Sequence, residues 1–233
     1  MNDARLKAFC SWMLILFSLL YVGIPLLVNI VLHESYLLFS GSPKMIVPVV
    51  LGAETALHFW FSIYTFLPLM LVPALICVRQ IFRNESRTYV DIACVFLLLA
   101  IIGKMFGGML LPSFNWTIGY FERTMSTEAQ QILVAVANAM NTYAVKYLEI
   151  GFGGLCFSIW FVMMGLLLRH TKDTRTWISI LLIVLGVLFF VLVLIEATLK
   201  DISYLQWFDL KAIAALWFFV FGLAVRWVDS AQA

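Results

Sequence analysis

The stretch WISILLIVLGVLFFVLVLIEAT, residues 177–198, decides the fold class, because it is 22 residues long and its only charged residue is Glu196. An α-helix needs about 20 consecutive apolar residues to cross the hydrocarbon core of a bilayer. In lipid, every backbone polar group needs a partner inside the protein, and a single segment meets that need only as a helix. The stretch therefore predicts a transmembrane helix.

The composition of the whole chain extends this prediction. Of its 233 residues, 64% are hydrophobic and 12% are charged, whereas soluble proteins average roughly 45–50% apolar and about 25% charged residues. So little charge does not cover a surface that faces water, and we expect most of the surface to face lipid. The net charge is only +2, and the thin spread of basic residues argues against a nucleic-acid partner.

Five further apolar runs have a similar length. The first of them is too long for the apolar core of a signal peptide, which has about 7–15 residues. Pro112 is expected to start a loop that lasts to about Ser126. We predict an all-α, polytopic membrane bundle in a single domain, residues 1–233, with six transmembrane helices at about 11–32, 53–78, 89–111, 149–168, 177–198 and 209–227.

The segment before the fourth span differs from the others. The 43 residues from Thr127 to Arg169 contain no proline, and one helix of that length would measure about 65 Å, roughly twice the hydrocarbon thickness. Its first half is rich in glutamine and asparagine, and its second half is apolar. We therefore divide it near residues 147–151 and predict an amphipathic or half-buried helix over 127–147 on the outer side.

Cysteine and histidine usage predicts neither a metal nor a cofactor. The chain has four cysteines, each alone in or beside an apolar run, and they form no Cys-x-x-Cys motif. We interpret them as packing residues: Cys10, Cys77, Cys94 and Cys156. Two of the three histidines, His33 and His170, are predicted on opposite sides of the membrane.

The basic residues predict the orientation. With six spans and a cytoplasmic N-terminus, the outer segments hold three basic residues, Lys44, Arg123 and Lys200, and the inner segments hold nine: Arg5, Lys7, Arg79, Arg83, Arg87, Arg169, Lys172, Arg175 and Arg226. Cytoplasmic loops carry the excess of lysine and arginine. Both termini are therefore predicted in the cytoplasm.

The ionisable residues within the apolar runs then gather toward the outer leaflet. A charged residue at the centre of a membrane helix costs roughly 2.5–3.5 kcal/mol, so such residues are candidates for function. Glu54, His58, Ser62 and Thr65 are four, four and three residues apart and share one helix face. We predict a polar cavity open to the outer leaflet, lined by Glu54, His58, Lys104, Asn138, Asn141, Lys146, Glu149 and Glu196.

A simpler interpretation competes with this cavity. Residues at helix ends sit in the headgroup zone, where charge costs little. That position alone would account for Glu54, Glu149, Asp209 and Lys211. Lys104 would then form a structural ion pair, with Glu54 or with Glu149.

Three functions remain open at this stage. The leading hypothesis is binding of a lipid-like or other small amphiphilic molecule from the outer leaflet, anchored by Glu54, His58, Lys104 and Glu149. The second is a non-catalytic membrane subunit or assembly factor, acting with a membrane protein partner or as a homo-oligomer. The third is a proton-coupled transporter or a membrane-embedded enzyme that uses Glu54 and His58.

Three segments resemble an uncharacterised bacterial family of six-helix membrane proteins, a domain of unknown function. Leu71-Val72-Pro73-Ala74-Leu75 before Arg79 resembles the end of that family's second helix. Residues 151–169, GFGGLCFSIWFVMMGLLLR, resemble its glycine-rich fourth helix, and residues 216–222 resemble its last helix. Lys211-Ala212-Ile213 departs from the acidic residue that the family has before the last tryptophan. The resemblance implies a bacterial plasma membrane (inner membrane) location and no particular activity.

The orientation is testable with fused reporters. We expect a reporter placed after Arg83 to be on the cytoplasmic side and one placed after Glu122 on the other side, because one span separates them. The measurement is the activity of a paired cytoplasmic and periplasmic reporter. Activity on the same side at both positions would contradict the predicted topology.

Overall fold

The structure is a computed structural model of the 233-residue chain. It describes residues 3–32, 62–83, 85–122, 142–171, 176–198 and 207–228, together with residues 59, 132, 135, 136 and 139. Within these ranges the regular structure is entirely helical, and no described residue belongs to a strand. The predicted all-α class is therefore confirmed.

The helices follow the apolar runs of the sequence. Residues 62–66 are helical and lead into a short 3₁₀ helix, η1. Thr142–Gly153 forms a π-helix, η2, that leads directly into α7. The elements are α1 (Asp3–Leu32), η1 (Leu67–Met70), α4 (Leu71–Ile81), α5 (Arg87–Glu122), η2 (Thr142–Gly153), α7 (Gly154–His170), α8 (Thr176–Thr198) and α9 (Trp207–Val225).

Among the described residues, five helical stretches are long and apolar enough to cross a membrane: Asp3–Leu27, Ser62–Ile81, Arg87–Met109, Lys146–His170 and Thr176–Thr198. The apolar part of α9, Leu210–Val225, is shorter. The chain thus has the length and hydropathy of a membrane-embedded helical protein. A sixth span at α9 stays a prediction.

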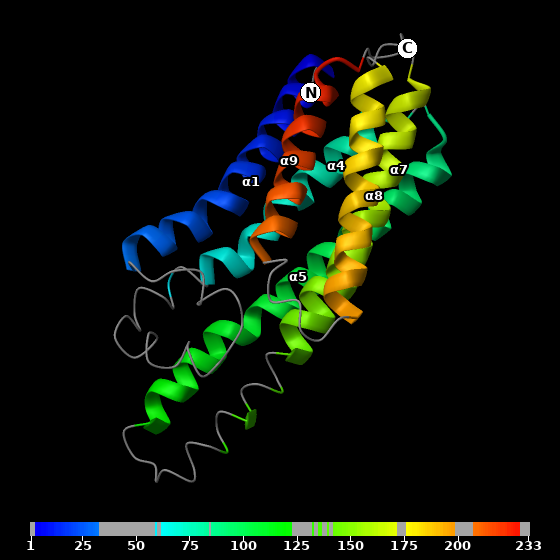
Figure 1. Ribbon diagram of the computed structural model, residues 1–233. Coiled ribbons are helices and arrows are strands. Elements are labelled where there is room, and N and C mark those ends of the chain that lie inside the picture. Colours follow the sequence, from blue (N-terminus) through cyan, green and yellow to red (C-terminus); the bar gives the residue numbers. More distant parts are fainter. Residues whose placement is uncertain are drawn as a thin grey trace.

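The helices pack as a closed ring in chain order (Figure 1). α1 contacts α4, α4 contacts α5, α5 contacts α7, α7 contacts α8, α8 contacts α9, and α9 returns to α1. Arg226 Nε near the end of α9 donates a hydrogen bond to Ser11 Oγ of α1 at 2.8 Å. At the same end α4 leads into α5, and α7 leads into α8 (Figure 1). We call this the basic end, because the helix termini that meet there carry arginines: Arg5 near the start of α1, Arg79 in the last turn of α4, Arg87 at the start of α5, Arg169 in the last turn of α7 and Arg226 just after α9.

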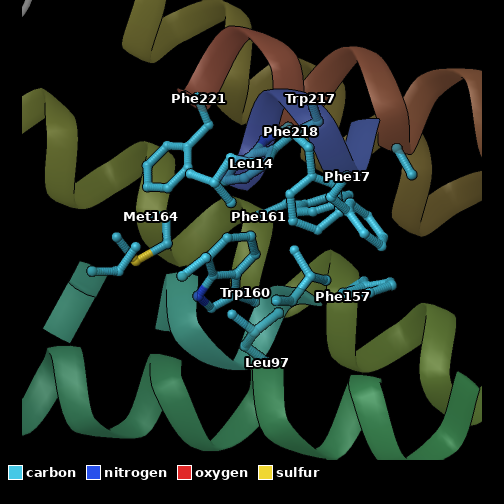
Figure 2. Close-up of a cluster of buried hydrophobic side chains, with 14 of the residues drawn as sticks. Leu14, Phe17, Leu97, Phe157, Trp160, Phe161, Met164, Trp217, Phe218 and Phe221 are labelled. Carbon is cyan, nitrogen blue, oxygen red and sulfur yellow. The ribbon is translucent and has the colours of Figure 1, made fainter. Parts of the chain in front are cut away.

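Aromatic side chains fill the middle of the ring (Figure 2). Phe17 of α1 meets the edge of Phe218 of α9 with ring centroids 4.9 Å apart. Trp160 of α7 packs against Trp217 of α9 at 4.9 Å, and both are fully buried. Trp217 Nε1 donates a hydrogen bond to the Leu182 carbonyl of α8 at 2.9 Å. The centre of the helix ring is therefore a packed core where these aromatic side chains meet.

Several predicted boundaries agree with the structure. The expected spans at 177–198 and 209–227 correspond to α8 and α9. The four cysteines are free and buried, as expected for packing residues. Trp12, Trp177 and Trp227 are 62%, 58% and 51% exposed, as tryptophans of an aromatic belt at a membrane interface would be.

Two predicted interruptions are wrong. Pro112 does not start a loop, because α5 continues through it to Glu122. A proline inside a helix removes one hydrogen bond, and such a loss is tolerated where other groups satisfy the freed carbonyl. The expected division near 147–151 is also wrong, since η2 runs through those residues and the backbone of Gly153 stays helical into α7. Most of the predicted helix at 127–147 lies outside the described residues.

The aromatic core should carry much of the stability. We expect Trp217→Ala to lower the free energy of unfolding by about 3–5 kcal/mol, because it leaves a cavity and removes the bond to Leu182. Unfolding in detergent is measured by the reaction of the buried cysteines with a maleimide dye. Trp177→Ala, at a side chain that is 58% exposed, is the control. Equal effects of the two substitutions would contradict this assignment of the core.

Candidate functional site

A buried ion pair joins α5 to η2, away from the basic end. Lys104 Nζ lies 3.9 Å from Glu149 Oε1, and the two residues are only 7% and 2% exposed. The sequence predicted both residues for the cavity and named Glu149 as a partner for Lys104. Removing two charges from water costs several kcal/mol per ion even after relaxation. The packing around the pair must supply that free energy.

Glycines of α5 allow the pair to form. A Cβ at position 107 would lie 2.5 Å from Glu149 Cβ and 2.7 Å from the Ala144 carbonyl oxygen. A Cβ at position 103 would lie 3.0 Å from Gly153 Cα. Gly103 and Gly107 therefore form the Gly-x-x-x-Gly face against which η2 packs, as such motifs do between membrane helices. Lys104 follows the first of these glycines in the chain. The close packing of α5 on η2 therefore brings the Lys104 side chain near η2.

The backbone of η2 is unusual in itself. The π-helix Thr142–Gly153 is 12 residues long and carries both Lys146 and Glu149. π-helical turns are rare, mostly limited to one turn, and frequent at functional sites. Its wider turn changes which residues face α5 compared with an α-helix of the same sequence. The placement of Glu149 thus depends on this backbone as well as on the glycines.

A second lysine joins the pair from α9. Lys211 is 2% exposed, and its Nζ lies 4.0 Å from the ring centre of Tyr64 and 5.7 Å from that of Tyr21. It interacts electrostatically with Glu149, which attracts it, and with Lys104, which repels it. The two tyrosine rings stack at 5.7 Å. We call Lys104, Glu149, Lys211, Tyr21 and Tyr64 the charged cluster.

A small cavity lies within this cluster. Its volume is about 10 Å³, and its walls include Tyr21, Lys104 and Lys211 together with apolar side chains of α8. This is about the volume that one water molecule requires. The charged groups are therefore closely packed, and a larger molecule would reach them only after side chains move.

Glu149 has hydrogen-bonding capacity to spare. Its Oε2 atom is buried and has no hydrogen-bond partner among the residues that the structure describes. Its Oε1 atom, at 3.9 Å from Lys104 Nζ, is beyond the usual length of a charge-assisted hydrogen bond, about 2.7–2.9 Å. Buried polar atoms are nearly always hydrogen-bonded, and an exception calls for an explanation. The carboxylate is thus able to accept a hydrogen bond from a bound group.

Two further predicted site residues of opposite charge lie outside the charged cluster. Lys146 of η2 and Glu196 of α8 are half-buried, and the two charges attract each other. Both residues were predicted for the cavity. Since Lys146 is three residues from Glu149, η2 connects this pair with the charged cluster.

The structure thus describes four of the eight predicted site residues: Lys104 and Glu149 form a buried ion pair, and Lys146 and Glu196 are opposite charges on η2 and α8. The other four, Glu54, His58, Asn138 and Asn141, lie outside the described residues. Thr65, predicted on the same face as Glu54, is buried and donates a hydrogen bond to the Gly108 carbonyl at 3.0 Å.

The interfacial interpretation is wrong for Glu149 and Lys211, which are both 2% exposed. Sequence reasoning therefore left Lys211 out of the site. Because Lys211 lies near the predicted start of a span, it was interpreted as a residue in the headgroup zone of the membrane. A lysine at the start of an otherwise apolar run was the sequence signal that could have singled it out.

Comparisons with protein-family models, with curated proteins and with solved structures find no match. The resemblance to a bacterial six-helix family therefore stays a prediction. Within the described part of the chain, no group of three histidine, cysteine, aspartate or glutamate side chains is arranged to hold a metal ion. The geometry of the charged cluster is the basis for assigning a function.

The close approach of α5 and η2 is testable by substitution. Gly107→Ala should destabilise the protein by about 1–3 kcal/mol, because the added methyl group overpacks the contact with Glu149 and Ala144. Gly23→Ala in α1 is the control, since a Cβ there meets no atom within 4 Å. Unfolding in detergent, followed by the maleimide reaction, measures both. A Gly107→Ala protein as stable as the control would contradict the packing described here.

The ion pair should show strong coupling. Lys104→Met alone should cost about 3–5 kcal/mol, because it leaves the Glu149 carboxylate buried without its closest cation. The double substitution Lys104→Met/Glu149→Gln should cost less than the sum of the two single losses, because Glu149→Gln alone leaves Lys104 and Lys211 buried without their anion and the second change removes one of these two charges. A double-mutant cycle of unfolding free energies measures the coupling. Additive losses would show that the two side chains do not interact.

Proposed function

We propose that this integral membrane protein binds a lipid-like or other small amphiphilic molecule, whose polar group contacts Lys104, Glu149 and Lys211. The observation that carries the proposal is the burial of three ionisable side chains at one level of an apolar bundle. Ionisable residues within membrane segments are rare and commonly mark sites of function. The uncommitted acceptor Oε2 of Glu149 favours a ligand that offers an O–H or N–H donor.

The position of the charged cluster supports entry from one leaflet. Lys104 follows Arg87 by 17 residues in α5, which is about 25 Å along a helix with a rise of about 1.5 Å per residue. If the basic end is cytoplasmic, as the sequence predicts, this distance supports a position of the charged cluster in the outer half of a hydrocarbon core about 30 Å thick.

The volume of the cavity limits how the ligand binds. Because about 10 Å³ holds one water molecule, only a small polar group of the ligand would replace water beside Tyr21 and the lysines. The apolar part would lie outside this cavity against the helices. A bulky headgroup is not compatible with the packing described.

The proposal is tested by identifying what the protein retains on extraction with its surrounding lipid in polymer nanodiscs. We expect mass spectrometry to find one amphiphile enriched over bulk lipid. Lys104→Met/Glu149→Gln should remove that enrichment while unfolding remains cooperative. Arg5→Met/Glu85→Gln, which makes the same charge change at exposed residues of the basic end, should retain it. A wild-type protein without an enriched amphiphile, or a double variant that keeps it, would contradict the proposal.

A non-catalytic subunit or assembly factor is the second candidate. It is favoured by the fact that Lys104 and Glu149 also join α5 to η2 where Gly103 and Gly107 bring the backbones together. On this view the same double variant loses a co-purifying membrane protein and no amphiphile. The use of Glu54 and His58 by a proton-coupled transporter or an enzyme also stays a prediction, since both residues lie outside the described ranges.

A further inference from the structure

A cleft opens at the basic end, far from the charged cluster. It has a volume of about 400 Å³ and lies where α4 ends and α5 begins, within the range of about 300–1,000 Å³ that is usual for small-molecule sites. Three arginines line it, Arg79, Arg83 and Arg87, and Ile76 and Val90 form its apolar part. The proposed function does not use these residues.

The charges of the cleft are arranged for an anion. Asp91 is the acidic residue of its wall, and Asp91 Oδ1 accepts a hydrogen bond from Arg79 Nε at 2.6 Å. This bond fixes the Arg79 guanidinium through one edge and leaves both terminal nitrogens for another partner. Neither Arg83 nor Arg87 forms an ion pair with any side chain that the structure describes. The wall therefore carries excess positive charge.

The turn that carries Arg83 is anchored to the core. Phe82 is 1% exposed, and its N–H donates to the Val78 carbonyl at 3.0 Å. The Phe82 carbonyl accepts from Glu85 N–H at 3.1 Å. Because its neighbour is held on both sides, the backbone at Arg83 is positioned beside Arg79 and Arg87. The three guanidinium groups thus belong to one built surface.

We propose that this cleft binds the phosphate group of an anionic membrane lipid. Guanidinium groups bind phosphate oxygens through paired hydrogen bonds. The cleft lies between the ends of two candidate spans, Ser62–Ile81 and Arg87–Met109, where lipid headgroups would be. Below it, Ile76 is 59% exposed and offers an apolar surface to an acyl chain. Basic pockets between membrane helices are suited to anionic headgroups, and this apolar extension favours a lipid over free phosphate.

The basic end also provides a matched control. Arg5 and Arg169 are exposed there, but they do not line the cleft. If the arginines serve only to orient the chain by the positive-inside rule, removing either pair should weaken lipid binding equally. A built site predicts that only the cleft pair matters.

The experiment titrates the full-length protein in detergent with dioleoylphosphatidylglycerol or with dioleoylphosphatidylcholine, and native mass spectrometry measures binding. We expect the wild type to prefer phosphatidylglycerol. Arg83→Gln/Arg87→Gln should weaken phosphatidylglycerol binding by about tenfold or more, and Arg5→Gln/Arg169→Gln should leave it unchanged. An excess of inorganic phosphate should not displace the lipid.

A charge-conserving pair guards against failed insertion. Arg83→Lys/Arg87→Lys keeps the charges that orient the chain but loses the paired hydrogen bonds, so it should insert normally and bind phosphatidylglycerol more weakly than the wild type does. Equal affinity of the wild type for both lipids would overturn the proposal. So would an equal loss in the two glutamine variants, unchanged binding in the lysine variant, or displacement of the lipid by inorganic phosphate.

Discussion

The contact on which the charged cluster depends is the close approach of α5 to η2. Gly103 and Gly107 remove the side chains that would hold these backbones apart, and the result is the burial of Lys104 beside Glu149. No apolar driving force pulls helices together inside lipid, so packing of this closeness has to come from small residues and from polar contacts. Here the small residues and the polar contact occur at the same contact between α5 and η2. The glycines let the ion pair form, and the ion pair helps to hold the two backbones together.

That contact explains why charge is tolerated so deep in an apolar chain. Glu149 forms an ion pair with Lys104 and is attracted by Lys211 of α9. Lys211 also makes a cation–π contact with the ring of Tyr64. Cations over aromatic rings gain more when they are removed from water. Three elements far apart in sequence, α5, η2 and α9, thus share the cost of desolvation. Such a cluster stabilises the bundle less than a well-packed apolar core of equal volume would, and this is the physical reason to assign it a function.

The sequence was sufficient where one local signal decides the structure. Continuous apolar runs predicted the helices at 177–198 and 209–227, which correspond to α8 and α9. It failed at Pro112, since a preference for turns in water does not hold where neighbouring groups satisfy the backbone. It also failed at Lys211, because no periodicity within α9 tells which residues of other helices lie opposite. The π-helical backbone of η2 has no sequence signature of comparable strength.

The two ends of the bundle treat charge in opposite ways. At the basic end Arg79, Arg83 and Arg87 are exposed around an open cleft, and Asp91, which pairs with Arg79, is accessible as well. Exposed pairs of this kind contribute about 0–1 kcal/mol to stability, so their arrangement is free to serve orientation and ligand contact. In the charged cluster, lysines and a glutamate are enclosed, and every unmatched charge is costly. The cleft that attracts anions and the charged cluster that would hold a small polar group are formed by different helix pairs. One of them can therefore be changed without changing the other.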